Sequence, residues 1–317
     1  MSFTFRTKVQ INELAEKLDH TKRYMFFGSC FSENMGNKFG YFKFTVINNP
    51  FGIVYNPASI VQQLQILLQK KVYQSWDLFY YNDLWNSYMH HGKFSGISKE
   101  EVLDTINRQI TESAEFLLKS DYLIITLGTA WVYQLKNSGQ VVSNCHKVPS
   151  NEFVRKMLTV TEIVNSFELI INELRKINPG IKIIFTISPV RHWKETAHGN
   201  QLSKSTLLLA VNELLKQVSH TFYFPSYEIL LDELRDYRFY ADDMLHPSDL
   251  AINYIWERFS ETCFSVNTQA LLKKIDQINK GMFHKPFNEN TSAHIRFKNN
   301  LLQQIVQLKT EFPYIKF

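Results

Sequence analysis

The chain is organised around the stretch Tyr24-Met25-Phe26-Phe27-Gly28-Ser29-Cys30-Phe31-Ser32-Glu33-Asn34-Met35-Gly36. This stretch predicts an apolar strand, a sharp turn at Gly28 and a helix that begins near Phe31. Such a turn holds a small nucleophilic side chain at the carboxyl end of a strand, where the free N–H groups of the new helix face the atom it attacks. The side chain in that position is the thiol of Cys30, and the hydroxyl of Ser29 is its rival.

A second motif lies near the other end of the chain, where Asp243 precedes His246 by three residues and Pro247 follows. The spacing and the proline favour an exposed, oriented imidazole. His246 is therefore the predicted general base, which accepts the Cys30 proton and later returns it, and Asp243 orients the ring. Asp242 is adjacent and could replace Asp243. The alternative is a hydrogen-bonded loop histidine with no catalytic role.

The composition indicates an ordinary globular protein. Of the 317 residues, 44% are hydrophobic and 21% are charged, which argues against disorder. The net charge of +5 comes from scattered basic residues, so no nucleic-acid partner is expected. No stretch approaches the ~18–20 apolar residues of a membrane span, and no apolar signal segment follows Met1, so we expect a cytoplasmic protein. The cysteines at 30, 145 and 263 are widely spaced and odd in number, which disfavours disulfides.

Apolar runs alternate with amphipathic stretches along most of the chain. Strands are expected at 24–27, 44–47, 122–127, 181–187 and 221–224, with helices between them and a hairpin at 131–142. This order predicts an α/β fold with a doubly wound, mostly parallel sheet and a site along the carboxyl edges of its strands. An aromatic, irregular segment at 73–96 is either a binding loop or a loop held by its own rings. We expect two domains: an α/β domain over 1–262 and a helical appendage over 263–317 packed on it.

Several of these motifs resemble those of the GSCFA-domain proteins. The resemblance covers about the first 260 residues and rests on four stretches: Phe27-Gly28-Ser29-Cys30-Phe31-Ser32, Gly128-Thr129-Ala130-Trp131-Val132-Tyr133, Asn144-Cys145-His146-Lys147-Val148-Pro149 and Ser203-Lys204-Ser205. That family is related to the SGNH, or GDSL-like, hydrolases, so the resemblance implies a flavodoxin-like, three-layer αβα fold. It also implies that Cys30 stands at the nucleophilic serine, and that Asp243 and His246 match the last catalytic block.

The resemblance further implies an oxyanion hole. The N–H groups of Cys30 and of Gly52, the counterpart of the second-block glycine, are its expected donors. The asparagine of the third block falls on Ala130, so one side-chain donor is missing. Three side chains are candidates to replace it: Asn144, the Trp131 indole and His91.

Two further groups have open roles. Cys145-His146 resembles a catalytic pair or half of a metal site, but adjacent side chains diverge and no second ligand pair at zinc spacing is present. No metal is therefore expected, and Cys145 and His146 are expected to have a structural or cleft-lining role. Arg191 and His192 follow the strand at 181–187 and either bind an anionic substrate group or lie in a solvated loop. Lys204, at the start of the next helix, is a weaker candidate.

The sequence thus predicts a hydrolase or acyltransferase that acts on an ester or thioester through Cys30, without a cofactor. Its partner would be a small-molecule or glycan acyl substrate. On this interpretation the helix dipole and a nearby histidine lower the pKa of Cys30. The alternative is a non-catalytic module that binds carbohydrate or a peptidoglycan fragment, with Cys30 a buried thiol that fills space. The patterns do not encode the acyl group or the oligomeric state.

Overall fold

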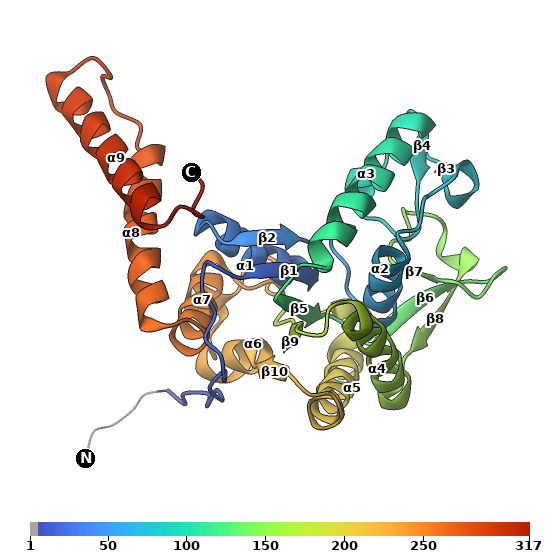
Figure 1. Cartoon of the computed structure of the whole chain (residues 1–317). Helices are drawn as coiled ribbons and strands as arrows, with labels where there is room; N and C mark the ends of the chain where they lie inside the picture. The colour runs from blue at the N-terminus through green and yellow to red at the C-terminus, as the bar shows by residue number, and fades with distance from the viewer. Residues whose placement is uncertain (1–5) are drawn as a thin grey trace.

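The computed structural model describes residues 6–317. Its centre is a parallel sheet of five strands: β1 (Arg23–Gly28), β2 (Thr45–Asn48), β5 (Tyr122–Leu127), β9 (Lys182–Ile187) and β10 (Thr221–Phe224). The strands lie side by side in the order β10-β9-β5-β1-β2 (Figure 1). If the five strands are renumbered 1 to 5 along the chain, their order across the sheet, read from β2 to β10, is 2-1-3-4-5. This is the flavodoxin-like order. The predicted doubly wound α/β fold is confirmed.

The sheet separates two hydrophobic cores because successive strand side chains point to opposite faces. In β1, Met25 and Phe27 belong to one core, and Tyr24 and Phe26 to the other. The first face is covered by α2 (Pro57–Gln69), α3 (Lys99–Leu117), α4 (Val160–Ile177) and α5 (Thr196–Gln217). The second face is covered by α1 (Cys30–Tyr41) and α7 (Asp249–Cys263). The result is the three-layer αβα arrangement.

The carboxyl ends of the central strands are level with one another. Gly28 at the end of β1 pairs with Thr126 in β5, which in turn pairs with Thr186 in β9. Gly28 has a φ of +148°, and a Cβ atom there would lie 2.4 Å from the carbonyl oxygen of Thr126. The turn that ends β1 therefore requires glycine, because a side chain would force β1 away from β5.

Smaller elements lie outside the central sheet. The predicted hairpin is present as β6 (Trp131–Leu135) and β7 (Val141–Val142), and β8 (Phe153–Met157), which the sequence analysis missed, pairs with the other side of β6. The aromatic segment at 73–96 contains a short hairpin of β3 (Phe79–Tyr81) and β4 (Leu84–Asn86). α5 begins at Thr196, several residues before Ser203 and Lys204, where the sequence predicts the helix to start. The first turns lack an apolar stripe, so the sequence does not reveal that they are helical. Between β10 and α7 lie three short helices: α6 (Ser226–Glu228), a π-helix over Ile229–Glu233 and a 3₁₀-helix over Tyr237–Phe239.

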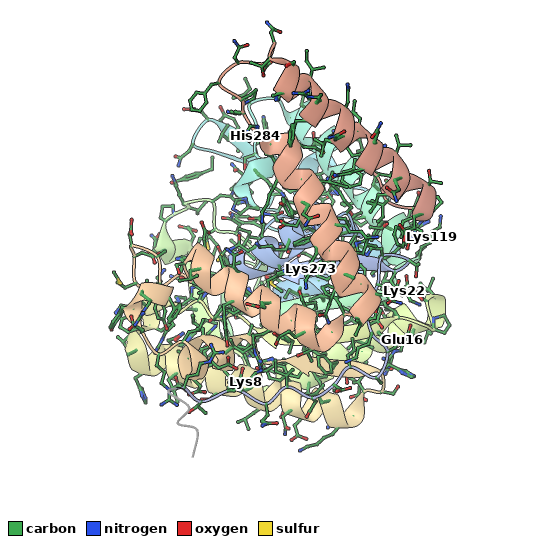
Figure 2. All side chains as sticks on the ribbon, turned by 90° about the vertical axis from the view of Figure 1, so that its left-hand side faces the viewer. Lys8, Glu16, Lys22, Lys119, Lys273 and His284 are labelled. Carbon is green, nitrogen blue, oxygen red and sulfur yellow. The ribbon has the colours of Figure 1, made fainter. Side chains whose placement is uncertain are left out.

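The last part of the chain forms two helices, α8 (Val266–Phe283) and α9 (Ser292–Glu311). Figure 2 looks onto this side of the molecule, where Lys273 of α8 lies higher in the view than Lys8 and Glu16 of the N-terminal segment. Buried residues of α8, including Ile275, belong to the same core as α1 and α7. A boundary at residue 262 stays a prediction, and residues 1–5 lie outside the described residues. Within 6–317, no helix combines the length and the apolar content that crossing a bilayer requires.

Candidate active site at the carboxyl edge of the sheet

Cys30 is the first residue of α1, directly after the turn that ends β1. The N-cap Ser29 makes no side-chain hydrogen bond to the helix, so that side chain leaves the first N–H groups of α1 unoccupied. Burial raises the pKa of the Cys30 thiol above its ordinary value, and this effect is larger than that of the neighbouring N–H groups of Phe31 and Cys30, which act to lower it. The expected net lowering of the Cys30 pKa is therefore wrong, because desolvation outweighs the helix N–H groups.

A buried lysine lies at the same strand ends. Lys204 of α5 has no exposed surface, and its Nζ donates to Gly128 O at 2.8 Å and to Ser188 O at 2.7 Å. Both acceptors are neutral carbonyl groups that follow β5 and β9. Burial, together with Arg191, lowers the pKa of Lys204 to about 7, and the nearby Cys30 acts in the opposite direction. A buried amine with such a shifted pKa beside a thiol marks a candidate functional site.

The family-like motifs converge here through hydrogen bonds. Ser29 Oγ donates to Ser188 Oγ at 2.9 Å, and Ser188 also supplies the carbonyl that binds Lys204. Ser203 Oγ accepts from the N–H of Ala130 at 2.8 Å and lies 3.0 Å from Thr129 Oγ1. Ser29, Ser188, residues 128–130 and residues 203–204 therefore form one polar network next to Cys30 in the chain.

Two of the predicted roles do not fit this geometry. Ser29 is fully buried and its hydroxyl is bound to Ser188, so it is not presented as a nucleophile. The N–H of Gly52 donates to Asn49 O at 2.8 Å, so it is not free for an oxyanion. Gly52 instead has a φ of +83° and lets His91 approach closely: a Cβ atom at Gly52 would lie 2.2 Å from the Cβ of His91.

Asp243 and His246 are in direct contact. His246 Nδ1 lies 2.5 Å from Asp243 Oδ2, and the N–H groups of Leu245 and His246 donate to Asp243 Oδ1, each at 2.9 Å. The backbone N–H of His246 is the main cause that lowers the pKa of Asp243 to about 2. The N–H of Arg191 donates to Leu245 O at 3.3 Å, which ties this loop to the residues that follow β9. Asp243, and not Asp242, thus holds the ring.

His192 links the buried and exposed parts of this edge. Its ring packs edge-on against Tyr55 at 5.4 Å, and its Nε2 is buried without a hydrogen-bond partner among the residues described. Burial is the main cause that lowers the pKa of His192 to about 4, and the charges of Lys204 and His246 add to it. Lys204 and His246 are therefore both close enough to His192 for their charges to act on its ring.

A cavity of about 440 Å³ opens beside this cluster. Its lining includes Tyr55 and His192, and three of the predicted site residues: His91, Trp131 and Asn144. The indole N–H of Trp131 is buried without a partner within the described chain, so it is available to a bound group. The Oδ1 atom of Asn144 accepts from the N–H of His146 at 2.8 Å. The three side chains proposed as substitutes for the missing donor thus line one cavity.

The remaining predicted residues lie outside the cavity. The Nε2 atom of His146 lies 2.8 Å from Ser87 O, and its ring packs against Phe79, so it holds the aromatic segment and does not line the cleft. Arg191 Nε donates to Asn200 Oδ1 at 3.2 Å. Of the two roles expected for His146, structural or cleft-lining, the contacts with Ser87 and Phe79 favour the structural one. In the described part of the chain no three His, Cys, Asp or Glu side chains are grouped as a metal site.

Sequence reasoning underrated Lys204 and missed Tyr55. A signal for Lys204 is present, because it shares a helix face with Leu207, Val211 and Leu214, all buried. A lysine on that stripe predicts a buried amine. Tyr55 carries no comparable signal: its carbonyl accepts from the N–H groups of Gly128 and Thr129, contacts that only the folded chain creates.

The fold and the site define a doubly wound α/β protein with a cysteine where a parallel strand meets a helix. The sequence matches the family model described as GSCFA family over residues 23–259, and that of the GSCFA domain protein, C-terminal domain, over 275–317. The chain belongs to the GSCFA family. No curated protein matches it.

Solved structures give distant similarities. One is described as a candidate platelet activating factor from Streptococcus pneumonia, with 16% identity and a TM-score of 0.38, over 77% of this chain and 84% of that one. Another is an acetyl xylan esterase from the rumen bacterium Butyrivibrio proteoclasticus, with 12% identity and a TM-score of 0.33, over 76% of this chain and 64% of the esterase. The chain thus spans less than two thirds of the esterase.

Proposed function

We propose that this protein is a hydrolase or acyltransferase that acts on an ester or thioester through Cys30. The observation that carries the proposal is the position of that thiol. It stands on the first residue of α1, among helix N–H groups that the N-cap side chain leaves unoccupied, and beside the buried amine of Lys204. A nucleophile so placed has donors ready for the charge that develops on the attacked carbonyl.

The proposed reaction begins with attack of Cys30 Sγ on the acyl carbon, while His246 Nε2 takes the thiol proton. The tetrahedral intermediate collapses, its C–O or C–S bond breaks, and His246 returns the proton to the departing alcohol or thiol. Water or an acceptor hydroxyl then attacks the acyl carbon of the acyl-thioenzyme and gives its proton to His246. The bond between that carbon and the Cys30 sulfur breaks, and His246 returns the proton to the sulfur. Asp243 keeps the imidazole in the required tautomer throughout.

The oxyanion would be bound by the first N–H groups of α1. Glu33 N–H donates to Ser29 O at 3.0 Å, so the N–H groups before Glu33 precede the first turn of backbone bonds. These donors take the place of the Gly52 N–H in the proposed oxyanion hole, because the Gly52 N–H donates to Asn49 O. The indole N–H of Trp131 is the candidate for the side-chain donor that Ala130 does not supply.

Lys204 would compensate for the burial of Cys30. Its positive charge favours a thiolate, whereas burial of Cys30 opposes one. The Lys204 charge alone does not overcome the effect of burial, so the Cys30 thiolate would form only when His246 is in place to remove the thiol proton. We further propose a cytoplasmic location, which suits a protein whose cysteines at 30, 145 and 263 are all free thiols.

The test compares Cys30→Ala with Cys263→Ala, a change of another free thiol that lies in the core and outside the cavity. Hydrolysis of p-nitrophenyl acetate and of a short thioester is measured as initial rates, and the acyl adduct is sought by mass spectrometry on the peptide that contains Cys30. We expect Cys30→Ala to abolish both turnover and the adduct, with the activity of Cys263→Ala close to wild type. Equal turnover in Cys30→Ala and wild type, or an adduct on another residue, would remove the proposal and support a non-catalytic role for the thiol.

A further inference from the structure

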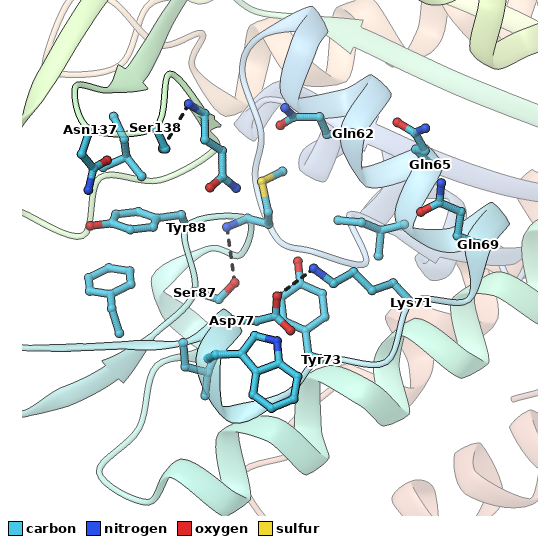
Figure 3. A pocket seen from close by; sticks show the side chains of 17 residues that line it. Gln62, Gln65, Gln69, Lys71, Tyr73, Asp77, Ser87, Tyr88, Asn137 and Ser138 are labelled. Atoms are coloured by element: carbon cyan, nitrogen blue, oxygen red, sulfur yellow. Dashed lines mark hydrogen bonds and ion pairs between the residues drawn. The ribbon is translucent and has the colours of Figure 1, made fainter.

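A groove of about 610 Å³ lies between α2, the segment at 73–79 and the β6–β7 hairpin (Figure 3). It shares no lining residue with the cavity beside His192. The hairpin separates the two hollows: Tyr133 and Val142 line the cavity, whereas Leu135 and Gln140 line the groove. The groove is therefore a separate feature that the proposed chemistry at Cys30 does not use.

Carboxamide side chains form two walls of this groove. Gln62, Gln65 and Gln69 lie on one face of α2, and Asn137 lies on the hairpin across from it (Figure 3). Gln140 of the hairpin also lines the groove. Each carboxamide offers both donors and an acceptor. The Oε1 atom of Gln62 is buried and has no hydrogen-bond partner among the described residues. A ligand that both donates and accepts would satisfy such walls.

Aromatic rings and one ion pair, whose two charges offset each other, complete the lining of the groove. Trp76 is 81% exposed, and the rings of Phe79 and Tyr88 stack with their centroids 3.9 Å apart. The two charged residues of the groove pair with each other, since Lys71 Nζ lies 2.8 Å from Asp77 Oδ1 (Figure 3). The groove therefore combines aromatic surface with uncharged polar groups and offers no unpaired charge of its own.

We propose that this groove binds a neutral oligosaccharide. The C–H faces of a sugar ring pack against aromatic rings, and its hydroxyl groups donate and accept as the carboxamides require. An apolar ligand would bury the carboxamides without partners, which is costly. An anionic ligand would have to break the Lys71–Asp77 pair to find a cation. The surplus of amide groups over charged groups thus selects an uncharged, hydroxyl-rich ligand.

The experiment is isothermal titration of the full chain with neutral xylo-, cello-, malto- and chito-oligosaccharides, and with an acidic uronic-acid oligosaccharide for comparison. We expect at least one neutral sugar to bind and the acidic one to bind more weakly. Trp76→Ala should weaken binding about tenfold, equivalent to about 1.4 kcal/mol. Gln69→Ala, a second exposed change on the opposite wall, should weaken it less.

Two controls keep the proposal falsifiable. Phe283→Ala removes an exposed aromatic ring from α8, outside the groove, and should leave binding unchanged. Cys30→Ala should also bind as wild type, so a failed activity assay leaves this test intact. The proposal is overturned if none of the neutral sugars binds, if the acidic sugar binds more tightly, or if both Trp76→Ala and Gln69→Ala bind as wild type.

Discussion

Lys204 and His246 are two basic side chains of the candidate site, and the fold holds them in opposite ways. Lys204 has no exposed surface and is fixed by two carbonyl groups at the ends of β5 and β9. His246 has a side chain that is 48% exposed, and it is held by Asp243 within its own loop. On the mechanism we propose, the difference separates two roles: a buried amine whose position the core fixes, and a base that solvent and substrate can reach.

The largest effect that this comparison predicts is on turnover in His246→Ala. Loss of a general base costs roughly 10²–10⁴ in rate. Because the ring is exposed, the free energy of unfolding should change by no more than about 0.5 kcal/mol. Initial rates with p-nitrophenyl acetate and urea unfolding measure the two quantities. Full activity in His246→Ala would contradict its role as the base, and a loss of stability as large as that of a core mutant would contradict its position on the exposed side of the site.

Lys204→Met should change the pH dependence of stability by a few kcal/mol. The Lys204 pKa is about 7 in the folded protein and ~10.4 in an unfolded chain. Between these values the unfolded chain binds one proton more, so wild type gains stability relative to Lys204→Met as pH rises, by up to about 1.4 kcal/mol per pH unit. Below pH 7 the full cost of burying the charge is present.

The measurement for this prediction is urea unfolding below pH 7 and near pH 10. Lys216→Met, an exposed lysine on the same helix, is the matched control, and its curve should parallel that of wild type. Parallel curves for wild type and Lys204→Met would show that Lys204 keeps an ordinary pKa.

Ser188→Ala tests the network beneath Cys30 and should cost about 1–3 kcal/mol of stability. The substitution leaves the Ser29 hydroxyl buried without its partner at 2.9 Å. Turnover should fall by less than in His246→Ala, since Ser188 positions strand ends and does not touch the thiol proton. In urea unfolding, the double change Ser29→Ala with Ser188→Ala should cost less than the two single changes together, and strict additivity would argue against the contact.

The smallest effect concerns Asp243 itself. Its pKa is lowered to about 2, so whatever stability the carboxylate provides is present above ~3.9 and lost as pH falls through about 2. The group is exposed, so we expect little change in overall unfolding. Carboxyl carbon shifts followed by NMR report its titration directly, and a midpoint near ~3.9 would mean that the hydrogen bonds around Asp243 are not maintained in solution.

Local features of the site were predictable from the sequence. An apolar run followed by Gly28 predicts the strand, the turn and the helix that place Cys30. Asp243 and His246 are three residues apart, so their contact depends only on the conformation of one short loop. Both predictions succeed because the deciding interactions lie within a few residues of each other.

Features that depend on tertiary contacts were not predictable. Whether the Ser29 hydroxyl faces solvent or Ser188 depends on a residue that lies far along the chain. The N–H of Gly52 was expected to be free, but Asn49 takes it in a turn whose geometry the sequence does not fix. The direction of the Cys30 pKa shift was not predictable for the same reason. The sequence shows that a helix begins at the thiol, but the burial that raises its pKa comes from tertiary packing.

The distance along the chain between Cys30 and His246 has a consequence for biosynthesis. More than two hundred residues separate them. At about 5–20 residues per second, a ribosome extends the chain for roughly 10–40 s after the thiol is made and before the imidazole exists. A half-finished polypeptide therefore carries the sulfur without its base. Acyl chemistry would begin only after the sequence up to the last catalytic block has been translated, which spares the emerging chain from modifying metabolites prematurely.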